Sequence, residues 1–103
     1  MSNKVYDVFI TDIAWEQMIE HTHFLKNISL DAANRFVGDF QATTDSLKQM
    51  PERCPWFIHD MVPFQKYRKI LFGRYHMALF QIQGKVVYIN TVVDCRKEYA
   101  FLL

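Results

Sequence analysis

The sequence is poor in cysteine, glycine and proline, and it contains no long apolar run. Its two cysteines, Cys54 and Cys95, stand in no CxxC motif and no histidine-rich cluster, so we expect neither a disulfide nor a metal site. The apolar stretches at 70–72 and 77–80 are far shorter than the roughly 20 residues of a membrane helix, and residues 1–4 lack an apolar signal-peptide core. The sequence therefore predicts a cytosolic protein with no membrane partner, no metal and no other cofactor.

Apolar and aromatic residues, by contrast, are plentiful. Half of the 103 residues are hydrophobic and 16% are aromatic, which is enough for one compact core. The chain is too short for two cores. No repeat, linker or low-complexity segment interrupts the chain. We therefore expect a single domain over residues 1–103.

Charge is unevenly distributed along the chain, although the net charge is only +1. Residues 1–60 hold five basic and nine acidic side chains, whereas residues 61–103 hold seven basic and two acidic ones. This asymmetry predicts that the C-terminal half meets an anion, such as nucleic acid or an acidic protein segment. The alternative is an ordinary solvated surface of mixed sign, and the sequence leaves both open.

The first half of the chain predicts one strand and two helices. Residues 6–10 alternate around aromatic and β-branched side chains, as a short strand does. A helix then follows Thr11 or Asp12 and ends near Asn27, and a second begins at Ser29 or Asp31. Their apolar faces recur at three- and four-residue steps: Ala14, Met18, His21 and Leu25 in the first, and Ala33, Phe36, Val37, Phe40, Thr44, Leu47 and Met50 in the second, until Pro51 interrupts it. The two helices should form an antiparallel hairpin.

The second half predicts a loop and three strands. All three prolines lie in the loop at 51–63, which Trp56 and Phe57 are expected to pin to the domain. Strands are expected at Tyr67 to Phe72, Tyr75 to Ile82 and Lys85 to Val93, with turns at Phe72-Gly73-Arg74 and Gln83-Gly84. The last strand is apolar on both faces and should be central. The fold class is α+β: an N-terminal strand, a two-helix hairpin and a three-stranded antiparallel meander.

Taken together, these pieces resemble the RelE/ParE toxin superfamily over nearly the whole chain. The order and spacing of several short motifs carry the resemblance, and the C-terminal Arg-x-x-Tyr after a long apolar strand is the most specific of them. The motifs are Tyr6-x-Val8-x-Ile10-Thr11-x-x-Ala14, the helical positions Met18, His21, Phe24 and Leu25, then Ala33, Phe36, Phe40 and Leu47 before Pro51, Tyr67-Arg68-Lys69-Ile70-Leu71-Phe72, Arg74-Tyr75, Val86-Val87-Tyr88-Ile89, and Val93-Asp94-Cys95-Arg96-Lys97-Glu98-Tyr99.

The resemblance implies a toxin that a cognate antitoxin wraps and neutralises. RelE-like members cut messenger RNA in the ribosomal A site, and ParE-like members inhibit DNA gyrase. RNA cleavage by a 2′-hydroxyl needs a base, an acid and cations, but no metal if the protein supplies them. Arg96 and Tyr99 match the Arg and aromatic pair of the family, so Arg96 would hold the phosphate and Tyr99 would stack on a base or assist proton transfer. Alternatively, Arg96 pairs with Asp94 or Glu98 and Tyr99 only packs.

The strand that begins near Arg74 departs from the nuclease pattern. RelE-like nucleases usually carry an arginine early in this strand, and here His76 or Met77 takes its place. His76 is therefore a candidate general base or acid, since histidine titrates near neutral pH, although a packed, hydrogen-bonded histidine is the more common case. Four basic side chains are the predicted RNA-binding residues: Lys66, Arg68, Lys69 and Arg74.

Three classes of function stay open on the sequence: a ribosome-dependent mRNA endoribonuclease, a gyrase inhibitor, and an antitoxin-binding module without activity. The Cys95-Arg96-x-x-Tyr99 ending favours the first slightly, whereas the long helical hairpin is typical of ParE-type members. An antitoxin would bind as an amphipathic helix or an added strand. Exposed aromatics would serve such a groove, but for each of these residues we expect ordinary packing: Trp15, Phe24, Trp56, Phe57 and Phe64. His21 and His23 point to different faces of a helix and predict no metal site.

Overall fold

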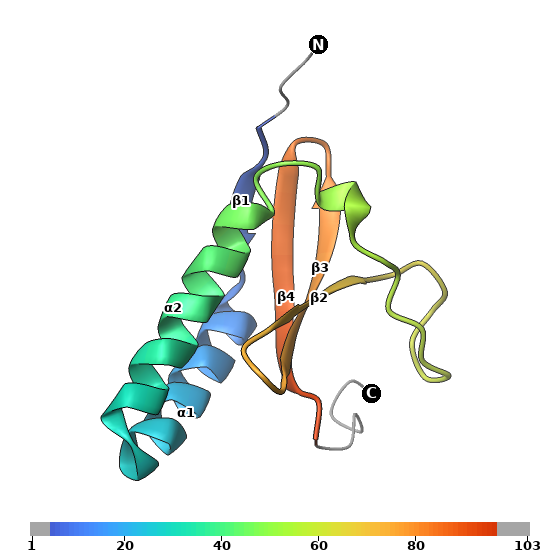
Figure 1. Cartoon of the computed structure of the whole chain (residues 1–103). Helices are drawn as coiled ribbons and strands as arrows, with labels where there is room; N and C mark the ends of the chain where they lie inside the picture. The colour runs from blue at the N-terminus through green and yellow to red at the C-terminus, as the bar shows by residue number, and fades with distance from the viewer. Residues whose placement is uncertain (1–4, 97–103) are drawn as a thin grey trace.

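A computed structural model describes residues 5–96, which form two helices and a four-stranded sheet (Figure 1). The elements, in chain order, are β1 (Asp7–Ile10), α1 (Asp12–Ile28), α2 (Leu30–Ser46), the short 3-10 helix η1 (Pro51–Arg53), β2 (Arg68–Phe72), β3 (His76–Gln83) and β4 (Val86–Asp94). This is the predicted α+β order, with each strand within one residue of its expected bounds. Neither helix of the described chain is long and apolar enough to cross a membrane.

Hydroxyl side chains set the two helix starts. Thr11 Oγ1 accepts a hydrogen bond from the Ala14 amide, and Ser29 Oγ accepts one from the Ala32 amide, both at 3.3 Å. These bonds satisfy amides that the first turn of a helix leaves without partners. Ser29 also ends α1, so the chain reverses within a single residue and the helices form the predicted hairpin.

The sheet has the strand order β1-β4-β3-β2. β4 pairs in parallel with β1 and antiparallel with β3, so the last strand is central, as predicted. Gly73 and Gly84 occupy the two turns with φ of 58° and 60°, a region that glycine enters without steric cost. The β2–β3–β4 meander is therefore confirmed, and β1 extends it at the far edge.

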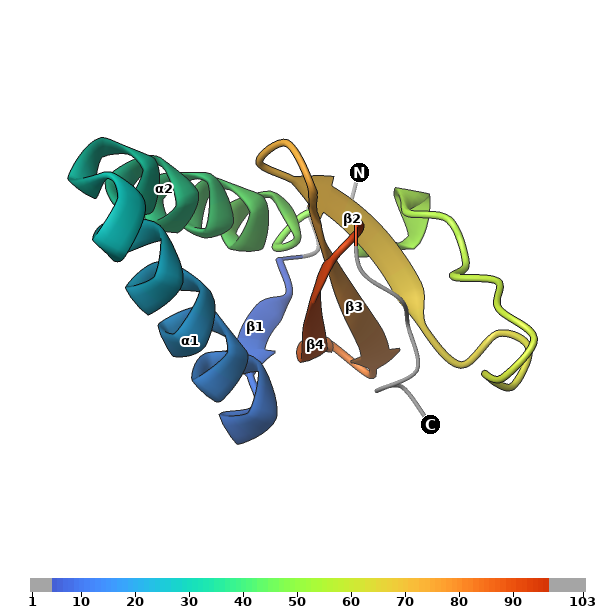
Figure 2. The ribbon, with the colours of Figure 1, turned by 90° about the horizontal axis from the view of Figure 1, so that it is seen from below.

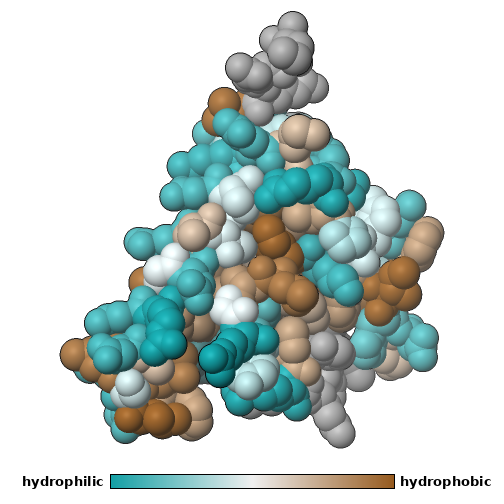
Figure 3. Space-filling model, in the orientation of Figure 1, coloured by the Kyte–Doolittle hydropathy of each residue, from teal (hydrophilic) through white to brown (hydrophobic). Residues whose placement is uncertain are grey.

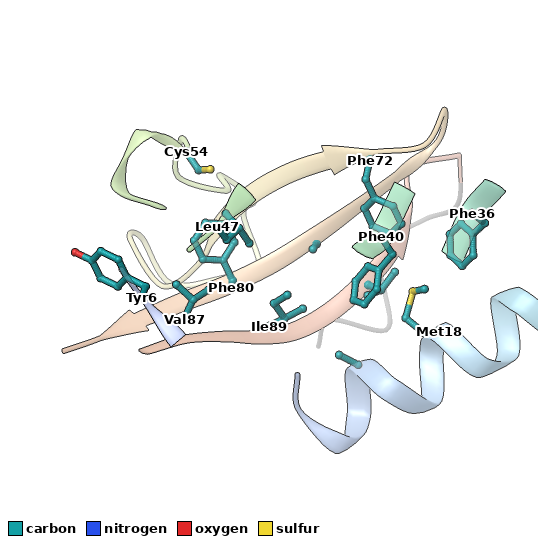
Figure 4. Close-up of a cluster of buried hydrophobic side chains, with 13 residues drawn as sticks. Tyr6, Met18, Phe36, Phe40, Leu47, Cys54, Phe72, Phe80, Val87 and Ile89 are labelled. Carbon is teal, nitrogen blue, oxygen red and sulfur yellow. The ribbon is translucent and has the colours of Figure 1, made fainter. Parts of the chain in front are cut away.

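The sheet buries apolar side chains on both faces. On one face the hairpin covers a core that includes Phe36, Phe40, Phe80, Val87 and Ile89 (Figure 4). The loop after η1 lies on the other side of the sheet, away from the helices (Figure 2). There it buries Phe57 and Val62 against Met77, Leu79 and Val93. The prediction that this loop is pinned to the domain is confirmed.

A bulge in β4 changes which residues face the helices. Phe80 pairs with Ile89, but Leu79 pairs with Thr91, so Asn90 is one residue more than β3 can match. Helix α1 stabilises the irregular backbone, because Gln17 Oε1 accepts a hydrogen bond of 2.7 Å from the Val92 amide. Beyond the bulge, Val92 and Asp94 share the helix-side face with Ala78 and His76 of β3.

Several side chains depart from their predicted positions. Helix α2 ends at Ser46, where the Arg53 guanidinium donates hydrogen bonds to the carbonyls of Ser46 and Gln49 at 3.2 and 2.7 Å. Met50 therefore lies outside the helix in a left-handed conformation and is 71% exposed, so its predicted place on the apolar face is wrong. Packing was also the wrong expectation for three aromatic side chains, which are largely exposed: Trp15, Phe24 and Phe64.

Candidate functional site

The candidate site lies at the end of the sheet where β3 begins and β4 ends. His76 and Asp94 are direct partners across these two strands, and the hairpin packs above them. Two adjoining hollows open here. The larger, of about 710 Å³, lies towards α2 and the β2–β3 turn, and the smaller, of about 290 Å³, lies towards α1. His76 and Arg96 line both hollows, so they sit on the wall between them.

Asp94 holds Arg96 in a two-pronged ion pair. Arg96 Nε donates to Asp94 Oδ1 at 3.2 Å, Nη2 donates to Oδ2 at 3.0 Å, and the Arg96 amide also donates to Oδ1. The guanidinium carbon lies 4.2 Å from the centroid of the Tyr75 ring. The pairing of Arg96 with Asp94, one of the two partners that the alternative interpretation of the sequence predicted, is thus present. The Arg96 side chain nevertheless remains 57% exposed.

This ion pair controls the titration of Asp94. The hydrogen bond from the Arg96 side chain lowers the pKa of Asp94 to about 2, a shift that burial opposes and that nearby His76 supports. The same hydrogen bond raises the pKa of Arg96. Asp94 is only 6% exposed and therefore stays a buried anion throughout the physiological range.

A pH-dependent loss of stability is expected on replacing Asp94 with asparagine. The folded-state pKa of Asp94 is depressed from 3.8 to about 2, so its stabilising contribution is present above about pH 4 and disappears as the pH falls through about 2. The shift corresponds to at most roughly 2 kcal/mol, because water screens the half-exposed Arg96. Urea unfolding should show that the variant has a lower free energy of unfolding than the wild type above about pH 4, and that this difference disappears towards pH 2. A difference of constant size would contradict this origin.

His76 sits in a cage of rings and is only 8% exposed. The centroid of its ring lies 4.6 Å from that of Phe36, 5.1 Å from that of His21 and 5.6 Å from that of Phe72. The packed histidine that the sequence offered as an alternative is thus present, although its edge reaches both hollows. His21 contacts it from α1 and lines the smaller hollow.

Positive charge surrounds the larger hollow. Arg35 from α2, Arg74 from the β2–β3 turn and Arg96 after β4 line it, and Asp39 is the acidic residue among the described lining residues. Guanidinium groups bind phosphate and carboxylate groups in a two-pronged geometry, so this hollow suits an anion. Within residues 5–96, no three histidine, cysteine, aspartate or glutamate side chains cluster as metal ligands do.

The structure divides the predicted site residues into two groups. His76, Arg74 and Arg96 come together here, whereas Lys66 and Arg68 line another hollow at the opposite end of the sheet. Lys69 lies on β2 and lines neither hollow. Tyr99 lies outside the described residues.

Sequence reasoning missed two residues of this site, His21 and Arg35. Both come from the hairpin, whereas every predicted site residue follows residue 65 in the chain. The position of His21 on the apolar stripe of α1 was the available signal, because a stripe residue must face the sheet. Arg35 precedes the buried Phe36 and carried no such signal.

Two comparisons found nothing: no family model matches this sequence, and no curated protein does. A solved structure does resemble it. One chain of the "Chromosomal ParDE TA system from P. aeruginosa" aligns with a TM-score of 0.70 over 88% of this chain and 97% of that one, at 19% identity. This chain has a RelE/ParE-like fold. The predicted fold is therefore confirmed.

Proposed function

We propose that this chain is the toxin of a toxin–antitoxin pair and that it cleaves messenger RNA on the ribosome. The observation that carries the proposal is the hollow lined by Arg35, Arg74 and Arg96, with His76 on its wall. Three guanidinium groups around one space match the negative charge that builds up on a phosphate during strand cleavage. The action would take place in the cytosol, where ribosomes are found.

In the proposed reaction, the 2′-hydroxyl of one nucleotide attacks the following phosphate. His76 takes the proton from this hydroxyl, the 2′-oxygen bonds to phosphorus, and the bond from phosphorus to the 5′-oxygen breaks. The departing oxygen takes a proton from Tyr99 or from water, and a 2′,3′-cyclic phosphate remains. The guanidinium of Arg96 stabilises the charged phosphorane, and Arg74 binds the RNA beside it. Lys66, Arg68 and Lys69 bind the RNA backbone farther along, away from the reacting phosphate.

The hairpin supplies a surface for the antitoxin in this proposal. A hollow of about 410 Å³ on its outer side is lined by Trp15, Ile19 and Val37, and apolar side chains also gather where the two helices meet at the lower left of Figure 3. Trp15 and Ile19 are 48% and 58% exposed and lie one helical turn apart, so they form a continuous apolar surface. An amphipathic helix of the antitoxin would cover this surface.

A second candidate function is inhibition of DNA gyrase. The observation that favours it is the Asp94–Arg96 ion pair, which uses two of the groups with which Arg96 would otherwise hold a phosphate. Together with the burial of His76, this pairing weakens the case for catalysis. A gyrase inhibitor needs a binding surface but no proton transfer.

Induced expression in a bacterium separates the two functions. The proposed nuclease should arrest growth and create new transcript 5′ ends within codons, within minutes of induction, and co-expression of the antitoxin should prevent both effects. Arrest with intact transcripts, together with binding of the purified chain to gyrase, would replace cleavage by gyrase inhibition. Absence of growth arrest would leave an antitoxin-binding module without activity.

A further inference from the structure

A third hollow, of about 420 Å³, lies at the end of the sheet opposite His76, where β2 begins and β3 ends. Its volume falls in the range of small-molecule sites. Most of its lining is polar, in contrast to the apolar hollow on the hairpin. The residues that matter for its chemistry are Glu52, Trp56, Gln65, Lys66, Arg68 and Gln81.

A rigid, flat platform forms one side of this hollow. The guanidinium carbon of Arg68 lies 3.9 Å from the centroid of the Trp56 ring, and Arg68 Nη1 donates to the carbonyls of Glu52 and Cys54 at 3.1 and 2.8 Å. The backbone bond from Lys69 N to Pro55 O, of 3.0 Å, ties the loop to β2 beside this pair. Aromatic rings and guanidinium groups such as these bind the faces of nucleic-acid bases.

Amide and carboxylate groups stand beside the platform. The side chains of Gln65 and Gln81 each offer a donor and an acceptor to the edge of a base. Glu52 Oε2 accepts a hydrogen bond from the Tyr6 hydroxyl at 2.9 Å, which orients the carboxylate and leaves Oε1 to accept from an amino group. Gln65 has a φ of 59°, a conformation that glycine would adopt without strain.

Positive charge completes the site. Lys66 and Arg68 carry two positive charges against the one carboxylate of Glu52. The Lys66 ammonium lies 5.3 Å from the centroid of the Tyr67 ring, a cation–π contact that restrains it at the rim. The surplus of positive charge suits a phosphate group next to a stacked base.

We infer that this hollow binds a nucleotide with an amino-bearing base. The base stacks on the Trp56–Arg68 platform, its amino group donates to Glu52, and its phosphate pairs with Lys66. The nucleotide is either free or one unit of a single-stranded RNA. Neither a ribosome nor cleavage is needed for this binding, so the inference stands or falls independently of the proposed nuclease activity.

Tryptophan fluorescence of the purified chain tests the inference directly. The sequence has two tryptophans, so Trp15→Phe leaves Trp56 as the sole reporter. In this background AMP should quench the fluorescence saturably and bind at least about tenfold more tightly than UMP, whose base has no amino group. Lys66→Gln should weaken AMP binding by about tenfold or more. The matched control is Lys26→Gln, whose side chain is exposed on α1, and it should leave AMP binding unchanged.

A short oligoadenylate distinguishes the two sources of the nucleotide. Binding at least about 100-fold tighter than that of AMP, and equally sensitive to Lys66→Gln, would identify a unit of RNA, whereas similar affinity would identify a free nucleotide. The inference is overturned if neither ligand quenches Trp56, if AMP and UMP bind equally, or if the two lysine variants behave alike. Quenching by an acidic peptide but by no nucleotide would also overturn it and make the hollow a protein-binding site.

Discussion

Replacing Arg96 with alanine is expected to lower the rate of mRNA cleavage on the ribosome by at least about 100-fold. Loss of one preoriented donor to a developing negative charge typically costs 10²- to 10³-fold in rate. Arg96 is preoriented here, because two nitrogens of its side chain donate hydrogen bonds to Asp94 and its guanidinium packs on the Tyr75 ring. Primer extension on purified ribosomes with the purified chain would measure the rate.

Controls must separate a catalytic loss from a folding defect. Arg96→Ala leaves the Asp94 carboxylate buried without its partner, so the double variant Asp94→Asn/Arg96→Ala should recover stability but not cleavage. Lys48→Ala removes a positive charge at an exposed pair with Asp45, whose side chains are 51% and 71% exposed, and should cleave normally. Cleavage at the wild-type rate by a folded Arg96→Ala variant would remove Arg96 from the proposed site.

Phe80→Ala is expected to lower the free energy of unfolding by about 3–5 kcal/mol. Phe80 is fully buried in β3, where its ring is among the core side chains of Figure 4. Truncation removes apolar contacts and leaves a cavity that the surrounding sheet and hairpin cannot close. Because small domains are stable by only about 5–15 kcal/mol, the variant should unfold at much lower urea concentration.

Leu71→Ala is the matched control for the core variant. Leu71 lies on the adjacent strand β2 but is 68% exposed, so its truncation should cost less than about 1 kcal/mol. A similar loss for both variants would contradict the assignment of Phe80 to the core. Urea unfolding followed by circular dichroism would compare them under the same conditions.

The sequence predicts the fold because its local signals agree with one another. Glycine marks the two hairpin turns at Gly73 and Gly84, period-two alternation marks the strands between them, and hydroxyl residues mark both helix starts. At each helix start the sequence offered two candidate caps, and the hydrogen bonds of the structure identify Thr11 and Ser29 as the caps. Agreement of this kind between local preference and global architecture is what makes a fold predictable.

The candidate site was less predictable, because it depends on long-range packing. Simple alternation along β4 would turn Asp94 away from the hairpin, and the extra residue Asn90 is what brings it beside His76. His21 and Arg35 enter from helices whose rotation about their axes the sequence fixes only roughly. The hollow beside Trp56 likewise joins Tyr6, which precedes β1, with residues of η1, the following loop, β2 and β3.

The central position of β4 sets the order of events during synthesis. Within residues 5–96, β1 pairs with β4 alone, so residues 7–10 have no strand partner until residues 86–89 are added. The ribosome adds them roughly 4–16 s later at the usual speed of translation. Until then the nascent chain has a helical hairpin and one β-hairpin, but no sheet that joins them, and His76 still lacks Asp94 opposite it. The two ends of the described chain thus become structured together, and the candidate site forms in one late step rather than gradually as the chain emerges.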